Sequence, residues 1–170
     1  MANRLHHVAR DERGMSLVFV TVSFMAVLTA TTLAIDIGMF MNSRSQAQNS
    51  ADAGALAGAV ALMYDNFEDR SPGGPAVTSA IAAATNNSVM KGTVSVTPAD
   101  VEFPLDDAGE ATRVKVTVRR TAARGNPVST LIAKYFGMAT ADIGATATAE
   151  VSPANAMTCV KPFTIPDKGE

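Results

Sequence analysis

An uncharged apolar run between Gly14 and Ile35, GMSLVFVTVSFMAVLTATTLAI, constrains the fold of this chain more than any other feature. At about 1.5 Å per residue, roughly 22 residues of helix extend about 33 Å, which is enough to cross the hydrocarbon core of a bilayer. A cleaved signal peptide is the alternative, because small residues around Ala34 offer a cleavage site, but its apolar region usually has about 7–15 residues. The length of the run favours a transmembrane helix over residues 15–36.

The basic residues that flank this run predict its orientation. Arg4, Arg10 and Arg13 precede it, whereas Arg44 is the one basic residue in about the first 20 positions after it. An excess of positive charge keeps the preceding segment in the cytoplasm. We therefore expect a cytoplasmic tail at residues 1–14, a helix in the lipid of a bacterial inner membrane, and the rest of the chain in the periplasm or at the cell surface.

Asp36 is the first charged residue after the run, and the sequence leaves two interpretations of it open. In the first it marks the exit from the membrane, where a carboxylate reaches headgroups or water, because deeper burial is costly. In the second it pairs with a cationic group on a neighbouring transmembrane subunit, since Ile35 and Ile37 keep its surroundings apolar.

The chain contains no proline between Asp36 and Pro72, and small residues recur there at helical spacing, which predicts that the helix continues over residues 37–64. Gly54 and Gly58 form a GxxxG pattern that allows another backbone to approach closely. Each glycine lowers helix propensity by about 1 kcal/mol relative to alanine, so we expect packing to compensate. The face packs either on a partner helix, giving a homo- or hetero-oligomer, or on the downstream sheet of the same chain. Its residues are Ala47, Ala51, Gly54, Ala55, Gly58 and Ala59.

Composition argues against several classes of function. The formal net charge is -2 and charged residues make up 18% of the chain, so a phosphate-binding surface for nucleic acid is not expected. One cysteine and two adjacent histidines, His6 and His7, do not complete a metal site, and we expect no cofactor. No histidine follows the apolar run, and the GxSxG and HExxH motifs are missing, so we do not expect an enzyme.

Cys159, the one cysteine, has three interpretations in an oxidising compartment. It is a free thiol, half of a disulfide with a residue outside this chain, or an intermolecular bridge. We do not expect it to act as a nucleophile, because no histidine downstream of the membrane run could activate it.

A small domain is expected over residues 65–153, after a Pro/Gly-rich breaker at residues 69–76. One helix is predicted over residues 76–86, entered at Pro75, and another over residues 126–138, with Asn126 as its cap and Gly137 as its stop. Alternation of apolar and polar residues predicts strands, which lie at residues 93–103, 112–121 and 142–152. This order indicates an α+β fold of pilin-like type, in which the long helix and short helices pack on an antiparallel sheet. Residues 154–170 are expected to be an extended tail.

The predicted strand at residues 112–121 carries a charged face with Arg113, Lys115 and Arg119. This face is either a ligand surface or the solvated outer side of a sheet that is buried on one side only.

The segment Glu12–Leu62 resembles the amino-terminal region of TadE/TadG-like proteins of the Tad (tight adherence, Flp) pilus-assembly system. The family pattern is an Arg-Gly pair, an apolar span, an Ala-x-Asp-x-Gly step and then a stretch similar to LQNAADAAALAGA. The matching residues here are Arg13, Gly14, Ala34, Asp36, Gly38, Gln48, Asn49, Ala51, Asp52, Ala53, Ala55, Leu56, Ala57, Gly58 and Ala59. Phe19 stands where TadE-like members with a prepilin-type processing site have a glutamate, which favours the TadG-like side.

The resemblance implies a single-pass inner-membrane protein with a periplasmic domain, which acts as a minor-pilin-like or anchoring subunit and contacts other Tad pilus or secretion subunits. It implies a structural role and no enzymatic activity. Two other hypotheses stay open: a pilin-like adhesin or periplasmic binding module released by cleavage near Ala34, and a signal-anchored periplasmic hydrolase.

Overall fold

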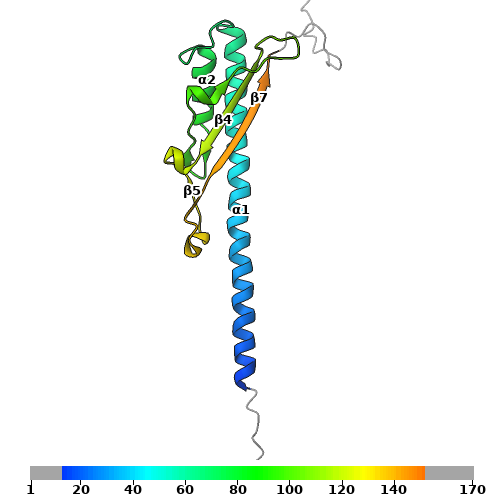
Figure 1. Ribbon diagram of the computed structural model, residues 1–170, viewed down its shortest axis with the longest axis vertical. Helices are drawn as coiled ribbons and strands as arrows, with labels where there is room; N and C mark the ends of the chain where they lie inside the picture. The colour runs from blue at the N-terminus through cyan, green and yellow to red at the C-terminus, as the bar shows by residue number, and fades with distance from the viewer. Residues whose placement is uncertain (1–12, 152–170) are drawn as a thin grey trace, which may run out of the picture.

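The first helix, α1 (Arg13–Tyr64), dominates the computed structural model, which describes residues 13–151 (Figure 1). Its 52 residues extend about 78 Å at about 1.5 Å per residue. The expected continuation of the apolar helix to Tyr64 is confirmed. The domain packs along the carboxyl-terminal part of α1, and the amino-terminal part extends alone beyond it (Figure 1).

The extended part of α1 is apolar and almost entirely exposed. Side chains from Gly14 to Ile35 are exposed, apart from the half-buried Thr32. Within residues 13–151, α1 is the one helix that has the length and composition to cross a membrane. Hydroxyl groups in this part bond back to the helix itself, as Thr21 does to the carbonyl of Leu17 and Thr29 to that of Met25. These bonds remove polar hydrogens from the apolar surface.

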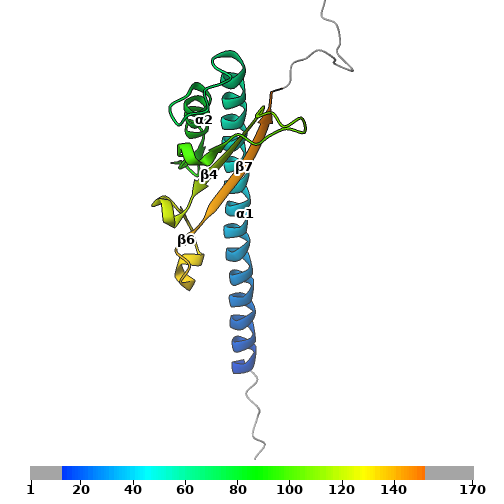
Figure 2. The same ribbon diagram turned by 45° about the horizontal axis from the view of Figure 1, so that its top comes forward.

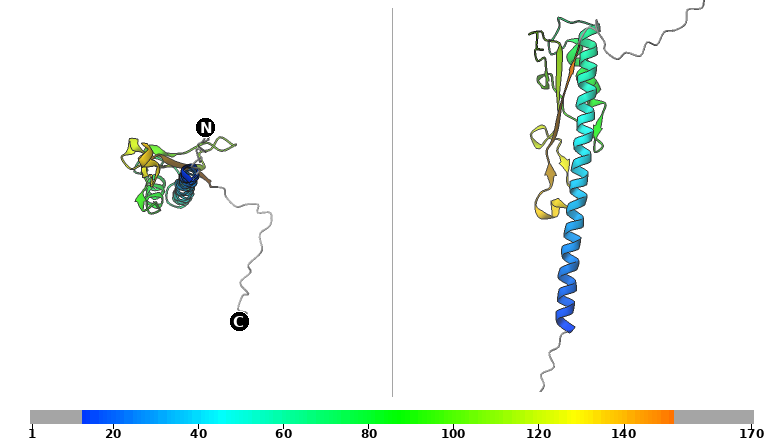
Figure 3. Two further views of the ribbon diagram at one scale, coloured as in Figure 1. Left: turned by 90° about the horizontal axis from the view of Figure 1, so that it is seen from below. Right: turned by 90° about the vertical axis from the view of Figure 1, so that its right-hand side faces the viewer.

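The domain has two layers. The second helix, α2 (Pro75–Thr85), lies beside α1, and an antiparallel sheet crosses both helices (Figure 3, left). The sheet consists of β3 (Val101–Glu102), β4 (Arg113–Arg120) and β7 (Ile143–Glu150) in the order β3-β4-β7. The expected α2 and the strands β4 and β7 are therefore confirmed, as is the α+β class.

The core lies between these two layers and uses mostly small side chains. Val114, Val116 and Val118 alternate toward the helices along β4, and all three are fully buried. The helices contribute alanines such as Ala51 and Ala80, which allow the helix backbones to come close to each other and to the sheet. Val116 pairs with Ala147 on β7, so the same small-residue packing continues across the sheet.

The single strand expected over residues 93–103 is wrong. The structure has a short hairpin of β1 (Ser88–Val89) and β2 (Gly92–Thr93), a 3-10 turn η1 (Pro98–Asp100), and only then β3. Pro98 has no N–H for a strand ladder. The side chain of Asp100 closes a capping box with Thr97, so the chain turns at this point.

The helix expected over residues 126–138 is also wrong. After the 3-10 turn η2 (Ala122–Arg124), the short strands β5 (Val128–Ser129) and β6 (Thr140–Ala141) form an antiparallel pair. A four-residue 3-10 turn, η3 (Ala133–Phe136), lies between them. Figure 2 shows that β6 and η3 lie beyond the end of the main sheet, on the side of the extended part of α1. Asn126 does not cap a helix, because its side chain bonds to Thr121 and Thr93. Gly137 does act as a stop, but for η3, with φ 89°.

Candidate functional site

The GxxxG pair of α1 lies against the domain of its own chain. A Cβ on Gly54 would stand 3.0 Å from both the carbonyl oxygen of Ala80 and the Cβ of Ala84. A Cβ on Gly58 would stand 2.9 Å from a methyl group of Val114 on β4. Both positions therefore need glycine so that α2 and the sheet can come this close to α1.

The rest of the small-residue face is buried in the same interface. Ala47, Ala51, Ala55 and Ala59 are at most 6% exposed. Between them, the Oγ of the buried Ser50 donates a 2.8 Å hydrogen bond to the carbonyl of Ala84 on α2. A partner helix cannot reach this face while α2 and the sheet cover it.

The opposite side of α1 carries a second apolar stripe, which is exposed. We call this the outer stripe; it consists of Leu56, Val60, Met63 and Tyr64. The spacing of i, i+4, i+7 and i+8 places these side chains along one side of the helix. This stripe is not apparent from the sequence alone, because alanine and glycine dominate the helical pattern in this part of the chain.

Asp36 joins α1 to a loop almost a hundred residues away. Its carboxylate is buried, with 3% of the residue exposed, and accepts hydrogen bonds from three consecutive backbone N–H groups. One oxygen accepts from Leu131 at 3.0 Å, and the other accepts from Ile132 at 3.1 Å and from Ala133 at 2.6 Å. These three N–H groups lie at the start of η3, where a helical turn leaves its first backbone donors without partners inside the turn. The negatively charged carboxylate of Asp36 accepts their hydrogen bonds.

This junction could not be seen in the sequence. The expectations for Asp36 were a mark of membrane exit or a partner for a cation on another subunit, and pairing with such a cation stays a prediction. No local pattern links Asp36 to residues 131–133, since the contact spans 97 residues for Ala133. The error in the expected helix over residues 126–138 also hid it, because helical N–H groups would bond within the helix.

A groove runs between α1 and the segment that Asp36 holds. Thr29, Thr32, Leu33 and Asp36 of α1 form one wall, and Ile132, Ala133, Phe136 and Met138 form the other. The volume is about 190 Å³, and the lining is almost entirely apolar apart from the bonded carboxylate. In Figure 3 (right) the gold segment lies next to α1 at the end of the domain that faces the extended part of the helix.

A second buried carboxylate, Asp100 of η1, lies beside the sheet and joins η1 to β4 and η2. It accepts hydrogen bonds from the N–H of Thr97 at 2.9 Å and the hydroxyl of Thr97 at 2.7 Å. Arg119 also bonds to it, as does Arg124 at 3.1 Å. Burial raises the pKa of this carboxyl, but the bonds from Thr97 and the two arginine charges outweigh burial and hold the pKa of Asp100 below its ordinary value of 3.8.

The charged face of β4 is largely paired within the sheet. Arg113 bonds to Glu150 on β7 at 2.9 Å, and Lys115 bonds to Glu102 on β3 at 2.9 Å. Both pairs are partly exposed, as expected for the outer side of a sheet with one buried face.

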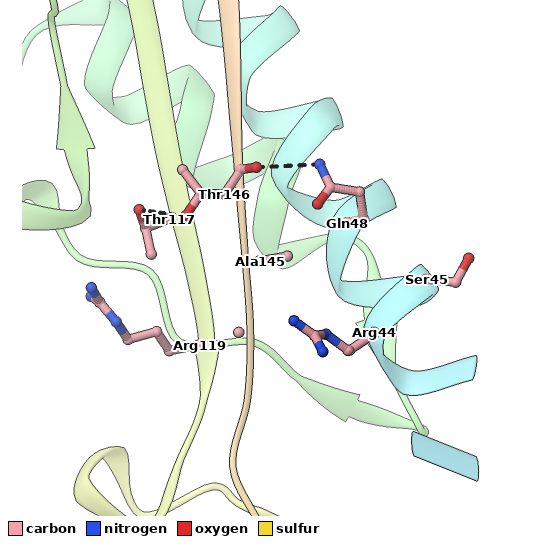
Figure 4. Close-up of a pocket in the computed structure, with 8 residues that line it drawn as sticks. Arg44, Ser45, Gln48, Thr117, Arg119, Ala145 and Thr146 are labelled. Carbon is pink, nitrogen blue, oxygen red and sulfur yellow. Dashed lines mark hydrogen bonds between the residues drawn. The ribbon is translucent and has the colours of Figure 1, made fainter. Parts of the chain in front are cut away.

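A shallow hollow beside this face is shown in Figure 4. Arg44 of α1 and Arg119 of β4 stand on either side of β7, and Gln48 donates to the carbonyl of Thr146 at 3.3 Å. The hollow is lined by arginine, glutamine, hydroxyl and small side chains, and Arg119 is already bonded to Asp100. The bond from Gln48 joins α1 to β7 at the edge of the sheet. Cys159, for which the sequence left three interpretations, lies outside the described residues 13–151.

Comparison with protein-family models gives one match. Residues 14–61 match the model described as "Putative Flp pilus-assembly TadE/G-like". The resemblance read from the sequence is thus confirmed over this segment, without a distinction between the TadE-like and TadG-like sides. No curated protein matches the chain, and no solved structure matches it. The matched segment ends three residues before the end of α1, so it covers the extended part of the helix, Asp36 and the small-residue face.

Proposed function

We propose that this protein is a membrane-anchored structural subunit of a Tad (Flp) pilus-assembly system, either minor-pilin-like or anchoring. The proposal starts from the match of residues 14–61 to the TadE/G-like family model. The amino terminus of the protein faces the cytoplasm and its α+β domain faces the periplasm or the cell surface. The proposed role is mechanical: α1 anchors the chain in the inner membrane and holds the domain at a fixed distance from it.

One observation carries this proposal. A single helix without a break holds both an exposed apolar stretch of membrane-spanning length and a small-residue face that binds the domain. Because α1 is continuous, and because Gly54, Gly58 and Asp36 hold it to the domain at separated points, the domain cannot swing on a linker. Force or position is therefore transmitted from the membrane to the domain along one rod.

Contact with other pilus or secretion subunits belongs to the same proposal. The small-residue face is occupied inside the chain, so we assign oligomer formation through α1 to the outer stripe, which is apolar and exposed. Side chains at the Leu56 and Val60 positions are spaced to meet a partner helix.

The first experiment is membrane fractionation of the expressed full-length protein, followed by protease digestion from the periplasmic side and amino-terminal sequencing. A carbonate-resistant protein that keeps Met1 and loses its domain to external protease supports the anchored subunit. A soluble product that begins near Ile35 contradicts it and supports the alternative, a secreted adhesin or binding module released by cleavage near Ala34.

The second experiment tests the pilus role itself. Deletion of the coding gene is expected to abolish or reduce surface pili and adhesion, and the full-length gene is expected to restore both. Unchanged piliation in the deletion strain, with the protein found in the membrane of the parent, contradicts a role in pilus assembly but leaves membrane anchoring intact.

A further inference from the structure

We propose that the loop between β5 and β6, residues 130–139, is a second membrane contact that inserts into the outer leaflet of the inner membrane and binds phospholipid beside α1. We call it the β5–β6 loop. This inference rests on the proposed function only in that α1 spans a membrane.

The exposed apolar surface of the domain is concentrated in this loop. Among the described residues after α1, 65–151, six large apolar or aromatic side chains are exposed, and four of them fall in residues 131–138. These four are Leu131, Tyr135, Phe136 and Met138, at 49%, 79%, 68% and 62% exposure. Such clustering on a small domain with few aromatic residues marks a contact surface.

The height of the loop along α1 identifies what covers this surface. The groove between the two is lined by Thr29, Thr32 and Leu33, which belong to the last two turns of the predicted span. Thr29 lies about 10 Å below Asp36 along the helix axis, since seven residues rise about 1.5 Å each. The apolar side of the loop is therefore continuous with the lipid-facing surface of α1 and lies at the depth of the outer leaflet.

Backbone polar groups of the loop have hydrogen-bond partners within the protein, as an environment with little water requires. Irregular backbone is tolerated at membrane depth only where its polar groups have partners in the protein. Asp36 accepts from the N–H groups of residues 131–133, and Thr130, Gly137 and Met138 donate to carbonyls within the loop. The hydroxyl of Thr130 also donates to the carbonyl of Met138 at 2.6 Å.

The polar side chain of the loop fits a headgroup region. Lys134 is exposed, and its ammonium lies 5.2 Å from the centre of the Tyr135 ring. Tyrosine and lysine at the edge of an apolar surface are typical of membrane interfaces, where the ring lies at headgroup level and the ammonium reaches phosphate. We therefore assign Lys134 to lipid phosphate, and Phe136 and Met138 to acyl chains in and around the groove.

The test uses the full-length protein in vesicles of phosphatidylethanolamine and phosphatidylglycerol. Single cysteines are introduced by Met138→Cys, Leu105→Cys or Phe24→Cys in a Cys159→Ser background, and each is labelled with a polarity-sensitive fluorophore. Quenching is measured with lipids that carry a spin label on the acyl chain and with aqueous iodide. Leu105 is the matched control, because it is 60% exposed and belongs to the loop between β3 and β4, at the opposite end of the sheet (Figure 1).

The expected result is that labels at positions 138 and 24 are quenched severalfold more by the lipid probe than by iodide, whereas the label at position 105 shows the reverse. A label at position 138 that behaves like the one at position 105 overturns the proposal while α1 still spans. A label at position 138 that is shielded from both quenchers also overturns it and points to a second copy or another subunit in the groove. Failure of the lipid probe at position 24 contradicts the membrane span and with it both proposals. Tyr135→Cys, at a side chain that is 79% exposed, provides a second reporter if Met138→Cys does not fold.

Discussion

The carboxylate of Asp36 accepts a 2.6 Å hydrogen bond from the backbone N–H of Ala133, 97 residues further along the chain. This bond, with those from Leu131 and Ile132, fixes the β5–β6 loop to α1 near the predicted exit of the helix from the membrane. One acidic residue of the matched segment thus determines where the β5–β6 loop lies relative to the proposed membrane span.

Replacement of Asp36 is expected to release the loop while leaving the rest of the domain folded. In Asp36→Leu the three N–H groups lose their acceptor, so amide exchange at residues 131–133 should become at least severalfold faster. Asp36→Asn keeps one acceptor oxygen and should show a smaller increase. Hydrogen-exchange mass spectrometry in lipid nanodiscs measures both. Asp52→Asn is the control, because Asp52 is exposed on the same helix and bonds only to Gln48 among the described contacts. Equal exchange rates at residues 131–133 in all three variants would refute the role of Asp36.

Substitution of Gly58 is expected to destabilise the domain although it improves helix propensity. In Gly58→Ala the new methyl group meets Val114 at 2.9 Å, and overpacking of this kind typically costs about 1–3 kcal/mol. Gly38→Ala is the matched control on the same helix, because apart from the neighbouring helix backbone nothing lies within 4 Å of its new Cβ, and it should gain up to about 1 kcal/mol. Urea-dependent pulse proteolysis of the full-length protein reports both changes. A Gly58→Ala variant as stable as Gly38→Ala would mean that α1 and the sheet are less closely packed than described.

The hairpin turn between β1 and β2 should tolerate glycine better than its native residues. Met90 and Lys91 have φ angles of 48° and 61°. Residues other than glycine and asparagine rarely adopt such backbone angles. Lys91→Gly is therefore expected to leave stability unchanged or raise it by up to about 1 kcal/mol, as relief of strain offsets the added entropy of the unfolded chain. Gly92→Ala should do the opposite, since its Cβ would stand 2.7 Å from the guanidinium of Arg120, and that guanidinium would have to leave its bonds to the carbonyls of Asn126 and Pro127. Thermal unfolding of the two variants is expected to give shifts of different sign or clearly different size.

Acid should weaken the domain through Asp100. Its pKa lies below the ordinary 3.8 in the folded protein, so the ionised form is favoured by folding. This contribution is fully present at pH values well above the ordinary 3.8 and is lost as the pH falls through the unfolded and then the folded pKa. Asp100→Asn is expected to lower the free energy of unfolding at pH 7 and to reduce the loss of stability as the pH falls below the ordinary pKa of an aspartate. A stability profile of the variant that runs parallel to that of the wild type would rule out Asp100 as a source of the acid sensitivity.

The outer stripe should matter for assembly rather than for folding. Val60→Lys places a charge on an exposed apolar position, so the domain should stay folded while association with other pilus subunits falls. Asn49→Lys adds the same charge at an exposed polar position of α1 and serves as the control. Pilus abundance and pull-down of envelope partners measure the effect; normal piliation with Val60→Lys would exclude this stripe as the subunit contact.

The long helix, α2 and the strands β4 and β7 could be predicted from the sequence, because their signals are local. The apolar run, the uninterrupted small-residue pattern and the alternation in RVKVTVRR each repeat within a few residues, and the periods of helix and strand differ. The TadE/G-like segment was recognisable for the same reason, since its pattern is contained in one continuous helix.

Tertiary contacts decided what the local pattern left open or predicted wrongly. The sequence allowed the Gly54 and Gly58 face to bind either a partner or its own chain, and only the folded domain shows α2 and β4 packed upon it. Residues 126–138 had the caps and spacing of a helix, but burial of Val128 and the acceptor at Asp36 favour a strand and a 3-10 turn. A carboxylate and three amides that are so distant along the chain meet only after the sheet has formed, so no local period could have predicted their contact.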